Sequence, residues 1–227
     1  AIDLIRLDDL HDWMPPQWVE KAIAKAASDE DRHPLAQGVG WWLVRKRSLE
    51  RLDITTVQNA IEQLGLQTGF VYRPGPAPHP TAALKPADWK RYPAAMGRGV
   101  IWLDSVIRPR RQSTATIATE LVHDAGGPAI FRFGYDDAVT VWLNSDEIYR
   151  SDESHNHYLD QAAVRVHLRK GKNRVVVQVG QKTNAWRFML RVTDPRGKVL
   201  PVQTHPTPWG PPPPPATGPL IEKVDHL

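Results

Sequence analysis

The feature that most constrains the fold is a series of short strand-like runs after Gly99. Seven runs, from VIWLDSVI to WRFMLRVTD, are rich in Val, Ile, Thr and aromatic residues. Turn sequences such as Gly126-Gly127-Pro128 and Lys170-Gly171-Lys172-Asn173 separate them, without helical patterns in between. Such runs pair antiparallel, so residues 99–202 are predicted to form a β-sandwich or jelly roll in a mainly β protein.

Alternation within the runs assigns side chains to the two faces of a sheet. In WRFMLRV the residues Trp186, Phe188 and Leu190 share one face. Trp142 and Trp186 are predicted to fill the interior of the sandwich, because large aromatic side chains dominate cores.

The flanks have a different composition. Residues 1–67 are predicted to form an arm and a small helical region, with short amphipathic helices between residues 16 and 66. Residues 68–98 are predicted to be an extended connection, because the stretch from Tyr72 to Pro93 holds six prolines. Residues 203–227 form a second Pro-rich arm. We expect its deletion to leave the sandwich as stable as before.

The region from about Trp89 to Val202 resembles the galactose-binding-like jelly-roll modules that accompany β-galactosidase-like enzymes and large exported bacterial proteins. The matching motifs are Asp136-Asp137, Val139-Thr140-Val141-Trp142-Leu143-Asn144, Leu168 with Gly171 and Asn173, and Trp186-Arg187-Phe188-Met189-Leu190-Arg191. The resemblance implies a sandwich fold and does not fix a ligand.

Two motifs of the resemblance have a structural interpretation. Asn144-Ser145 stands where the family usually has Asn-Gly, so Ser145 predicts a looser turn. Asp136 and Asp137 are predicted to cap a turn, and a structural calcium ion is left open.

The sequence holds no motif of a catalytic or cofactor site. It lacks cysteine, which excludes disulfides, thiolate metal sites and cysteine nucleophiles. It also lacks the Gly-x-Ser-x-Gly, phosphate-loop and His-Glu-x-x-His patterns. His155 and His157 have metal-ligand side chains, but a solvated loop is the simpler interpretation. We therefore expect a protein that is not an enzyme and carries no cofactor or metal.

Charge and hydropathy bear on partners and location. The net charge is +4, but the basic clusters lack the interleaved aromatic residues of a nucleic-acid platform, so no nucleic-acid partner is expected. No run approaches the roughly 20 apolar residues that span a bilayer. The first residue is Ala1, which fits removal of a leader or of the initiator methionine alone. We expect the former, and with it an extracytoplasmic location, periplasmic or secreted.

Two functional classes remain. The first is an extrinsic scaffold subunit that holds other subunits of a larger assembly, such as a respiratory or photosynthetic membrane complex. Its partner-binding residues lie in the C-terminal arm, where a polyproline rod carries an apolar tip: Trp209, Leu220, Ile221 and Val224.

The alternative is a carbohydrate-binding module, in which sugars stack on exposed aromatic residues of loops. The candidate sugar-binding residues are Tyr135, Tyr149, Tyr158 and His157.

Overall fold

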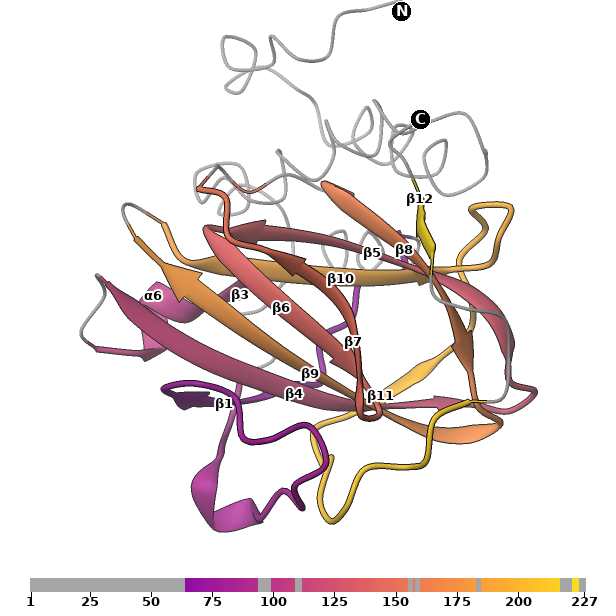
Figure 1. The fold of residues 1–227 in the computed structure, drawn as a ribbon, viewed down its shortest axis with the longest axis horizontal. Helices are drawn as coiled ribbons and strands as arrows, with labels where there is room; N and C mark the ends of the chain where they lie inside the picture. The colour runs from indigo at the N-terminus through magenta and orange to yellow at the C-terminus, as the bar shows by residue number, and fades with distance from the viewer. Residues whose placement is uncertain are drawn as a thin grey trace, which may run out of the picture.

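The structure is a computed structural model that describes residues 64–93, 99–108, 112–154, 157, 160–182 and 185–216, and the backbone of 222–224. Two antiparallel sheets face each other (Figure 1). The larger has seven strands in the order β2-β1-β4-β9-β6-β7, with β11 also paired to β4, and the smaller has the order β12-β8-β5-β10-β3. The predicted β-sandwich is therefore confirmed.

The strands and short helices follow one another along the chain as β1 (Val71–Pro74), η2 (Pro86–Asp88), β2 (Lys90–Arg91), β3 (Ile101–Trp102), α6 (Leu103–Val106), β4 (Ser113–His123), β5 (Gly127–Asp136), β6 (Ala138–Leu143), β7 (Asp146–Ser151), β8 (Ala162–Leu168), β9 (Gly171–Gln181), β10 (Arg187–Thr193), β11 (Gln203–His205) and β12 (Glu222–Val224). The sheets thus include strands outside the predicted residues 99–202: β1 and β2 come before them in the chain, and β11 and β12 come after them. Most of the predicted helical region lies outside the described residues, among which no helix is long and apolar enough to cross a membrane.

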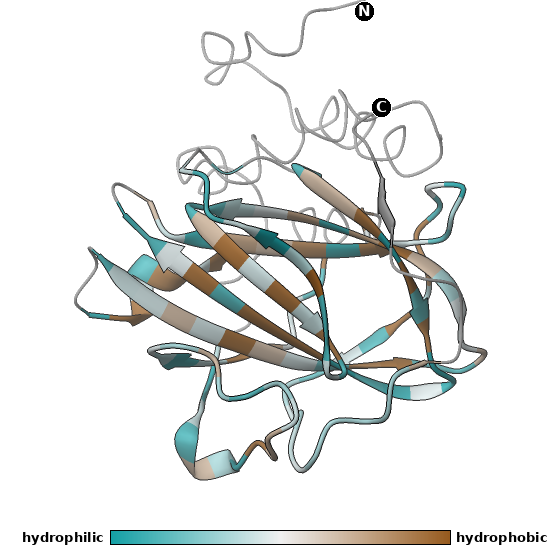
Figure 2. Cartoon of the chain, in the orientation of Figure 1, coloured by the Kyte–Doolittle hydropathy of each residue, from teal (hydrophilic) through white to brown (hydrophobic). Residues whose placement is uncertain are grey.

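The core lies between the two sheets and follows the alternation of side chains. Brown bands alternate with teal or pale bands along strands of the larger sheet (Figure 2). Trp186 is fully buried in this core, and its indole N–H donates to the carbonyl of Val179 at 3.3 Å. The predicted interior position of Trp186 is confirmed.

Trp142 is buried in a different place from the one predicted. Its neighbours Val141 and Leu143 point into the core, so alternation turns Trp142 to the outer face of the larger sheet. There it is 9% exposed, in a second apolar cluster with Trp89 of the Pro-rich connection and the half-buried Trp209 of the C-terminal arm. The interior position predicted for Trp142 was wrong, because an additional layer of chain covers this face.

That additional layer consists of the two Pro-rich segments, residues 75–89 and 206–216. They are joined by a reciprocal backbone pair, in which the N–H groups of Leu84 and Gly210 each donate to the other's carbonyl at 2.9 Å. The two segments lie next to β1 and β4 in Figure 1. The expectation that the C-terminal arm contributes nothing to the sandwich is therefore wrong for the part that the structure describes.

Arg174 of β9 binds this layer to the larger sheet. It is 2% exposed, and its guanidinium donates to the carbonyls of Gly210 (2.9 Å), Pro80 (2.9 Å) and Ala82 (3.1 Å). Burial lowers the pKa of Arg174 to about 10, so the side chain stays charged at neutral pH. One buried cation thus ties both Pro-rich segments to the sheet.

The turn at Asn144-Ser145 is tighter than predicted. Leu143 pairs directly with Asp146, which leaves a two-residue turn. Asn144 adopts a φ of 59°, a left-handed conformation that asparagine tolerates. Its side-chain oxygen accepts the backbone N–H of Arg174 at 2.9 Å. This hydrogen bond holds the turn without the glycine that the resemblance leads one to expect.

Candidate functional site

Three side chains from adjacent strands of the smaller sheet lie on one rung at an end of the sandwich. Arg187, the first residue of β10, pairs with Trp102 of β3 on one side and with Asp136, the last residue of β5, on the other. Their neighbours Ile101 and Phe188 belong to the core. Alternation therefore places all three on the outer face of the sheet, and we call them the Trp102 rung.

The cation of the rung stacks on its aromatic ring. The guanidinium carbon of Arg187 lies 4.2 Å from the centroid of the Trp102 indole, within cation–π distance. Trp102 is held in turn by its backbone N–H, which donates to the hydroxyl of Tyr92 at 2.9 Å. Burial lowers the pKa of Arg187, and the carboxylates of Asp104 and Asp136 raise it. The half-buried guanidinium is thus fixed beside two acidic groups.

Asp136 carries a buried carboxylate to which no described residue donates a hydrogen bond. The residue is only 4% exposed. Burial and the adjacent Asp137 raise the pKa of Asp136 to about 7, while Arg187 lowers it and Asp104 raises it further. Near neutral pH the carboxyl group of Asp136 is therefore present in both its protonated and its ionised form.

Asp137 differs from its neighbour because the protein satisfies its carboxylate. One oxygen accepts the backbone N–H of Lys182 at 2.7 Å, and the other accepts the hydroxyl of Ser154. Its own backbone N–H donates to the carbonyl of Gly180 at 3.0 Å, and the peptide bond between Asp136 and Asp137 is cis. These contacts join Asp137 to residues 45 and 17 positions away in the chain, so they do not test the local turn cap predicted for the pair.

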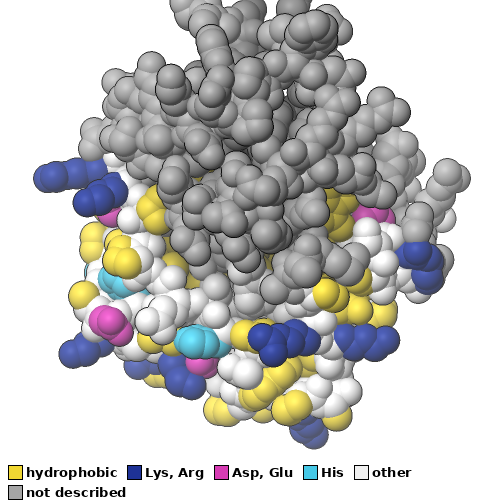
Figure 3. Space-filling view, turned by 180° about the vertical axis from the view of Figure 1, so that it is seen from behind, with side chains coloured by type: hydrophobic (Ala, Val, Ile, Leu, Met, Phe, Trp, Pro, Cys, Tyr) yellow, Lys and Arg dark blue, Asp and Glu magenta, His cyan; other side chains and the backbone are white. Residues whose placement is uncertain are grey.

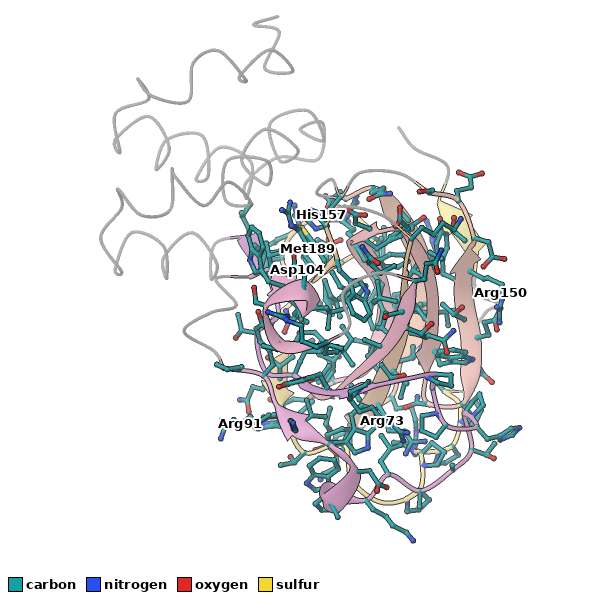
Figure 4. All side chains as sticks on the ribbon, turned by 90° about the vertical axis from the view of Figure 1, so that its left-hand side faces the viewer. Arg73, Arg91, Asp104, Arg150, His157 and Met189 are labelled. Atoms are coloured by element: carbon teal, nitrogen blue, oxygen red, sulfur yellow. The ribbon has the colours of Figure 1, made fainter. Side chains whose placement is uncertain are left out.

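The site also contains two buried polar atoms without a hydrogen-bond partner in the described structure. They are Oδ1 of Asp104, in α6, and Nε of Arg187. Figure 4 shows Asp104 at α6 on one flank of the sandwich, whereas Arg150 lies on the opposite flank. Because buried donors and acceptors are nearly always paired with protein, water or a ligand, these two atoms are candidates for hydrogen bonds to a bound polar molecule.

The site is thus equipped to bind a polar ligand with an apolar face. It offers carboxylate acceptors, a guanidinium donor and an indole that is half-buried. Within the described residues no group of three or more His, Cys, Asp or Glu side chains is placed to hold a metal ion.

The two candidate sugar-binding tyrosines that the structure describes are not loop platforms. Tyr135 belongs to β5 and is 2% exposed, and its hydroxyl lies 2.9 Å from that of the half-buried Tyr149. The ring of Tyr149 packs edge-on against Phe133 at 4.9 Å. Both were expected in loops, but their strands turn them towards the core. His157 is buried as well, and Tyr158 lies outside the described residues.

The residues predicted to bind a protein partner are only partly described. Trp209 packs against the chain's own outer cluster. The backbone at Val224 forms part of β12, an edge strand paired with β8 at Ala163. Leu220 and Ile221 lie outside the described residues. The described part of the arm is therefore attached to its own sandwich.

Sequence reasoning did not identify Trp102, Asp104 or Arg187. One signal was available: the alternation that turns Trp186 and Phe188 inward also turns Arg187 outward. The pairing of Arg187 with Trp102 and Asp136 carries no signal in a single sequence, because it depends on the order and register of strands far apart in the chain.

Comparisons with known proteins show distant likenesses only. No protein-family model and no curated protein matches the sequence. Among solved structures, the chain is similar to the PA14 domain of the MpAFP antifreeze protein, at 13% identity and a TM-score of 0.33 over 40% of this chain and 52% of that one. It is also similar to a PA14 sugar-binding domain from an RTX adhesin, at 14% identity and a TM-score of 0.31 over 40% and 51%.

A third likeness is to the β-glucosidase of Kluyveromyces marxianus in complex with glucose, at 17% identity and a TM-score of 0.38 over 56% of this chain and 15% of that one. The chain thus spans about half the length of the PA14 domains and a small part of the glucosidase. With TM-scores below 0.5, these likenesses do not assign the chain to any of these groups.

Proposed function

We propose that this protein is a non-catalytic carbohydrate-binding module whose ligand occupies the Trp102 rung together with Asp104. The observation that carries the proposal is the pair of buried atoms without a partner, the acceptor Oδ1 of Asp104 and the donor Nε of Arg187. They stand beside a half-buried indole at one end of the sandwich.

A sugar ring matches these groups in chemistry. Each hydroxyl both donates and accepts, so one sugar can satisfy a carboxylate and a guanidinium at the same time. Hydrogen bonds to charged groups contribute more than neutral ones. The C–H face of the ring supplies apolar area for the indole, as in ligand sites that combine aromatic walls with a few polar groups.

The state of Asp137 supports the proposal of binding without catalysis. Hydrolysis of a glycoside normally uses two carboxyl groups in separate roles. Asp137, the carboxylate adjacent to Asp136, already accepts hydrogen bonds from Lys182 and Ser154. The chain also lacks any recognisable catalytic motif. The proposal keeps the extracytoplasmic location, where polysaccharides are accessible to a binding module.

The scaffold hypothesis stays a prediction. It drew on arms that reach away from the sandwich, whereas the described part of the C-terminal arm is held by Arg174 and by pairing with Leu84. Lysine and arginine side chains are spread over the described surface seen from behind (Figure 3). No single patch of positive charge on that view points to an anionic partner surface.

The proposal is tested with a panel of immobilised glycans, followed by calorimetry with the best ligand, with and without calcium. Arg187→Gln and Trp102→Ala are expected to weaken binding at least tenfold. Arg73→Gln is the matched control, because Arg73 lies over Trp89 in a similar cation–π contact, at 5.9 Å, outside the site. Full binding by the Arg187 and Trp102 variants would refute the assignment of the site, and failure to bind any glycan would refute the function.

A further inference from the structure

We infer that the site prefers sugar residues that carry a protonated amine over neutral and acidic sugars, an inference that rests on the proposed function. It concerns the charge of the ligand, which the stacking and hydrogen-bond argument leaves open. Two observations support it: the balance of charged groups at the site, and the carboxyl group of Asp136, to which no described residue donates a hydrogen bond.

Among the described residues, the site has more acidic than basic groups. The carboxyl groups of Asp104 and Asp136 lie near the guanidinium of Arg187, and that of Asp137 adjoins Asp136. The nearby ammonium of Lys182 donates instead to the backbone carbonyl of Asp152 at 2.8 Å, in an exposed position. A half-buried site with this balance attracts cations and repels anions, because its charges are poorly screened by solvent.

A second buried carboxylate beside the same sheet, that of Asp160, is balanced by positive charges of the chain itself. There Asp160 accepts from Arg191 at 3.2 Å and lies 3.9 Å from Arg132. Two guanidiniums thus surround one carboxylate. Asp136 is equally buried, but among the described residues it has one neighbouring guanidinium, that of Arg187, which it shares with Asp104. A cationic ligand would therefore act at Asp136 as the second guanidinium acts at Asp160.

The ammonium group of an amino sugar fits the available acceptors. It has three donors and no acceptor, and Asp136 together with Oδ1 of Asp104 offers acceptors that no described residue uses. Each contact is a charge-assisted hydrogen bond, which is about twice as strong as a neutral one. The carboxylate of a uronic acid in the same place meets like charges instead.

The overall charge of the chain makes this inference easy to test. The net charge is +4, so long-range attraction favours acidic glycans and repels cationic ones. A preference for amino sugars therefore has to come from the local carboxylates and cannot arise from non-specific attraction to the net charge of the chain.

The experiment compares three oligosaccharides of equal length at neutral pH and moderate salt: a glucosamine oligomer, its N-acetylated form and an oligogalacturonate. We expect the glucosamine oligomer to bind at least tenfold more tightly than the other two. Asp136→Asn, which keeps size and shape, is expected to remove this preference, so that the glucosamine oligomer binds no more tightly than its N-acetylated form. Asp104→Asn is expected to reduce it.

Asp124→Asn is the matched control, because Asp124 is exposed in the turn before β5, at the opposite end of the strand from Asp136. It makes the same change in net charge and is expected to retain the preference. Equal binding of the three oligomers, tighter binding of the uronate, or equal loss in the Asp124 variant would overturn the inference while leaving the proposed function intact. Binding of none of them or of any other glycan would overturn the proposed function itself.

Discussion

Replacing Arg174 by methionine is the sharpest test of how the Pro-rich segments are held. Methionine keeps most of the length of the side chain and removes its donors. The change breaks three hydrogen bonds, to the carbonyls of Pro80, Ala82 and Gly210. Gly210 retains the N–H of Leu84 as a partner, so the carbonyls of Pro80 and Ala82 lose the partner that Arg174 provides.

The magnitude follows from these two carbonyls. A buried acceptor left without a partner costs about 1–3 kcal/mol, and the half-buried carbonyls of Pro80 and Ala82 lie in the lower part of this range. Part of this loss is offset, because burying a guanidinium is itself unfavourable and methionine adds apolar contacts. We therefore expect Arg174→Met to lower the free energy of unfolding by about 2 kcal/mol.

The measurement is urea unfolding followed by circular dichroism, combined with amide hydrogen exchange of Leu84 and Gly210. A local loss of about 2 kcal/mol accelerates exchange of these two amides about thirtyfold. Arg196→Met is the control, because Arg196 is exposed and uses only its backbone N–H, which donates to Asp194. An unchanged unfolding midpoint together with unchanged exchange in the Arg174 variant would refute the claim that Arg174 holds the Pro-rich segments on the sheet.

Three further predictions concern the core, the arm and the site. Trp142→Ala is expected to cost about 3–5 kcal/mol in urea unfolding, and a loss below 1 kcal/mol would show that the outer cluster contributes little. Deletion of residues 203–227 is expected to destabilise the sandwich measurably, because it removes β11, Trp209 and the partner of Leu84; equal stability would restore the view of a free arm. The folded-state pKa of Asp136, about 7, lies above the ordinary value of 3.8 for an aspartate, so between these values the folded state holds a proton that the unfolded state has released. Stability therefore falls as pH rises from about 4 to about 7, by at most about 1.4 kcal/mol per unit, and Asp136→Asn is expected to flatten this slope in pH-dependent unfolding.

The interior of the sandwich could be predicted because it depends on a local rule. Alternation along each run assigns residues to faces, and it placed Trp186, Phe188 and Leu190 correctly in the core. The same rule, applied to Val139 and Val141, turns Trp142 outward. The error there came from assuming that a buried indole has to lie between the sheets.

The outer layer and the candidate site could not be predicted in the same way. Arg174 reaches carbonyls 94, 92 and 36 residues away along the chain, and no local pattern indicates such contacts. The Trp102 rung likewise depends on β10 lying between β3 and β5 in the sheet. Tyr135 was expected in a loop, since the end of β5 looks like a turn from Tyr135-Asp136-Asp137 alone.

The most direct test of the central claim is to observe the rung by nuclear magnetic resonance while a glycan ligand is added. The Nε–H of Arg187 and the indole N–H of Trp102 give side-chain signals that report on the site itself. The account predicts that both signals shift with the same saturation curve and that the Arg187 signal exchanges more slowly with solvent once its unpaired donor is occupied. Saturable binding that shifts the signals of other side chains and leaves both of these unchanged would contradict it.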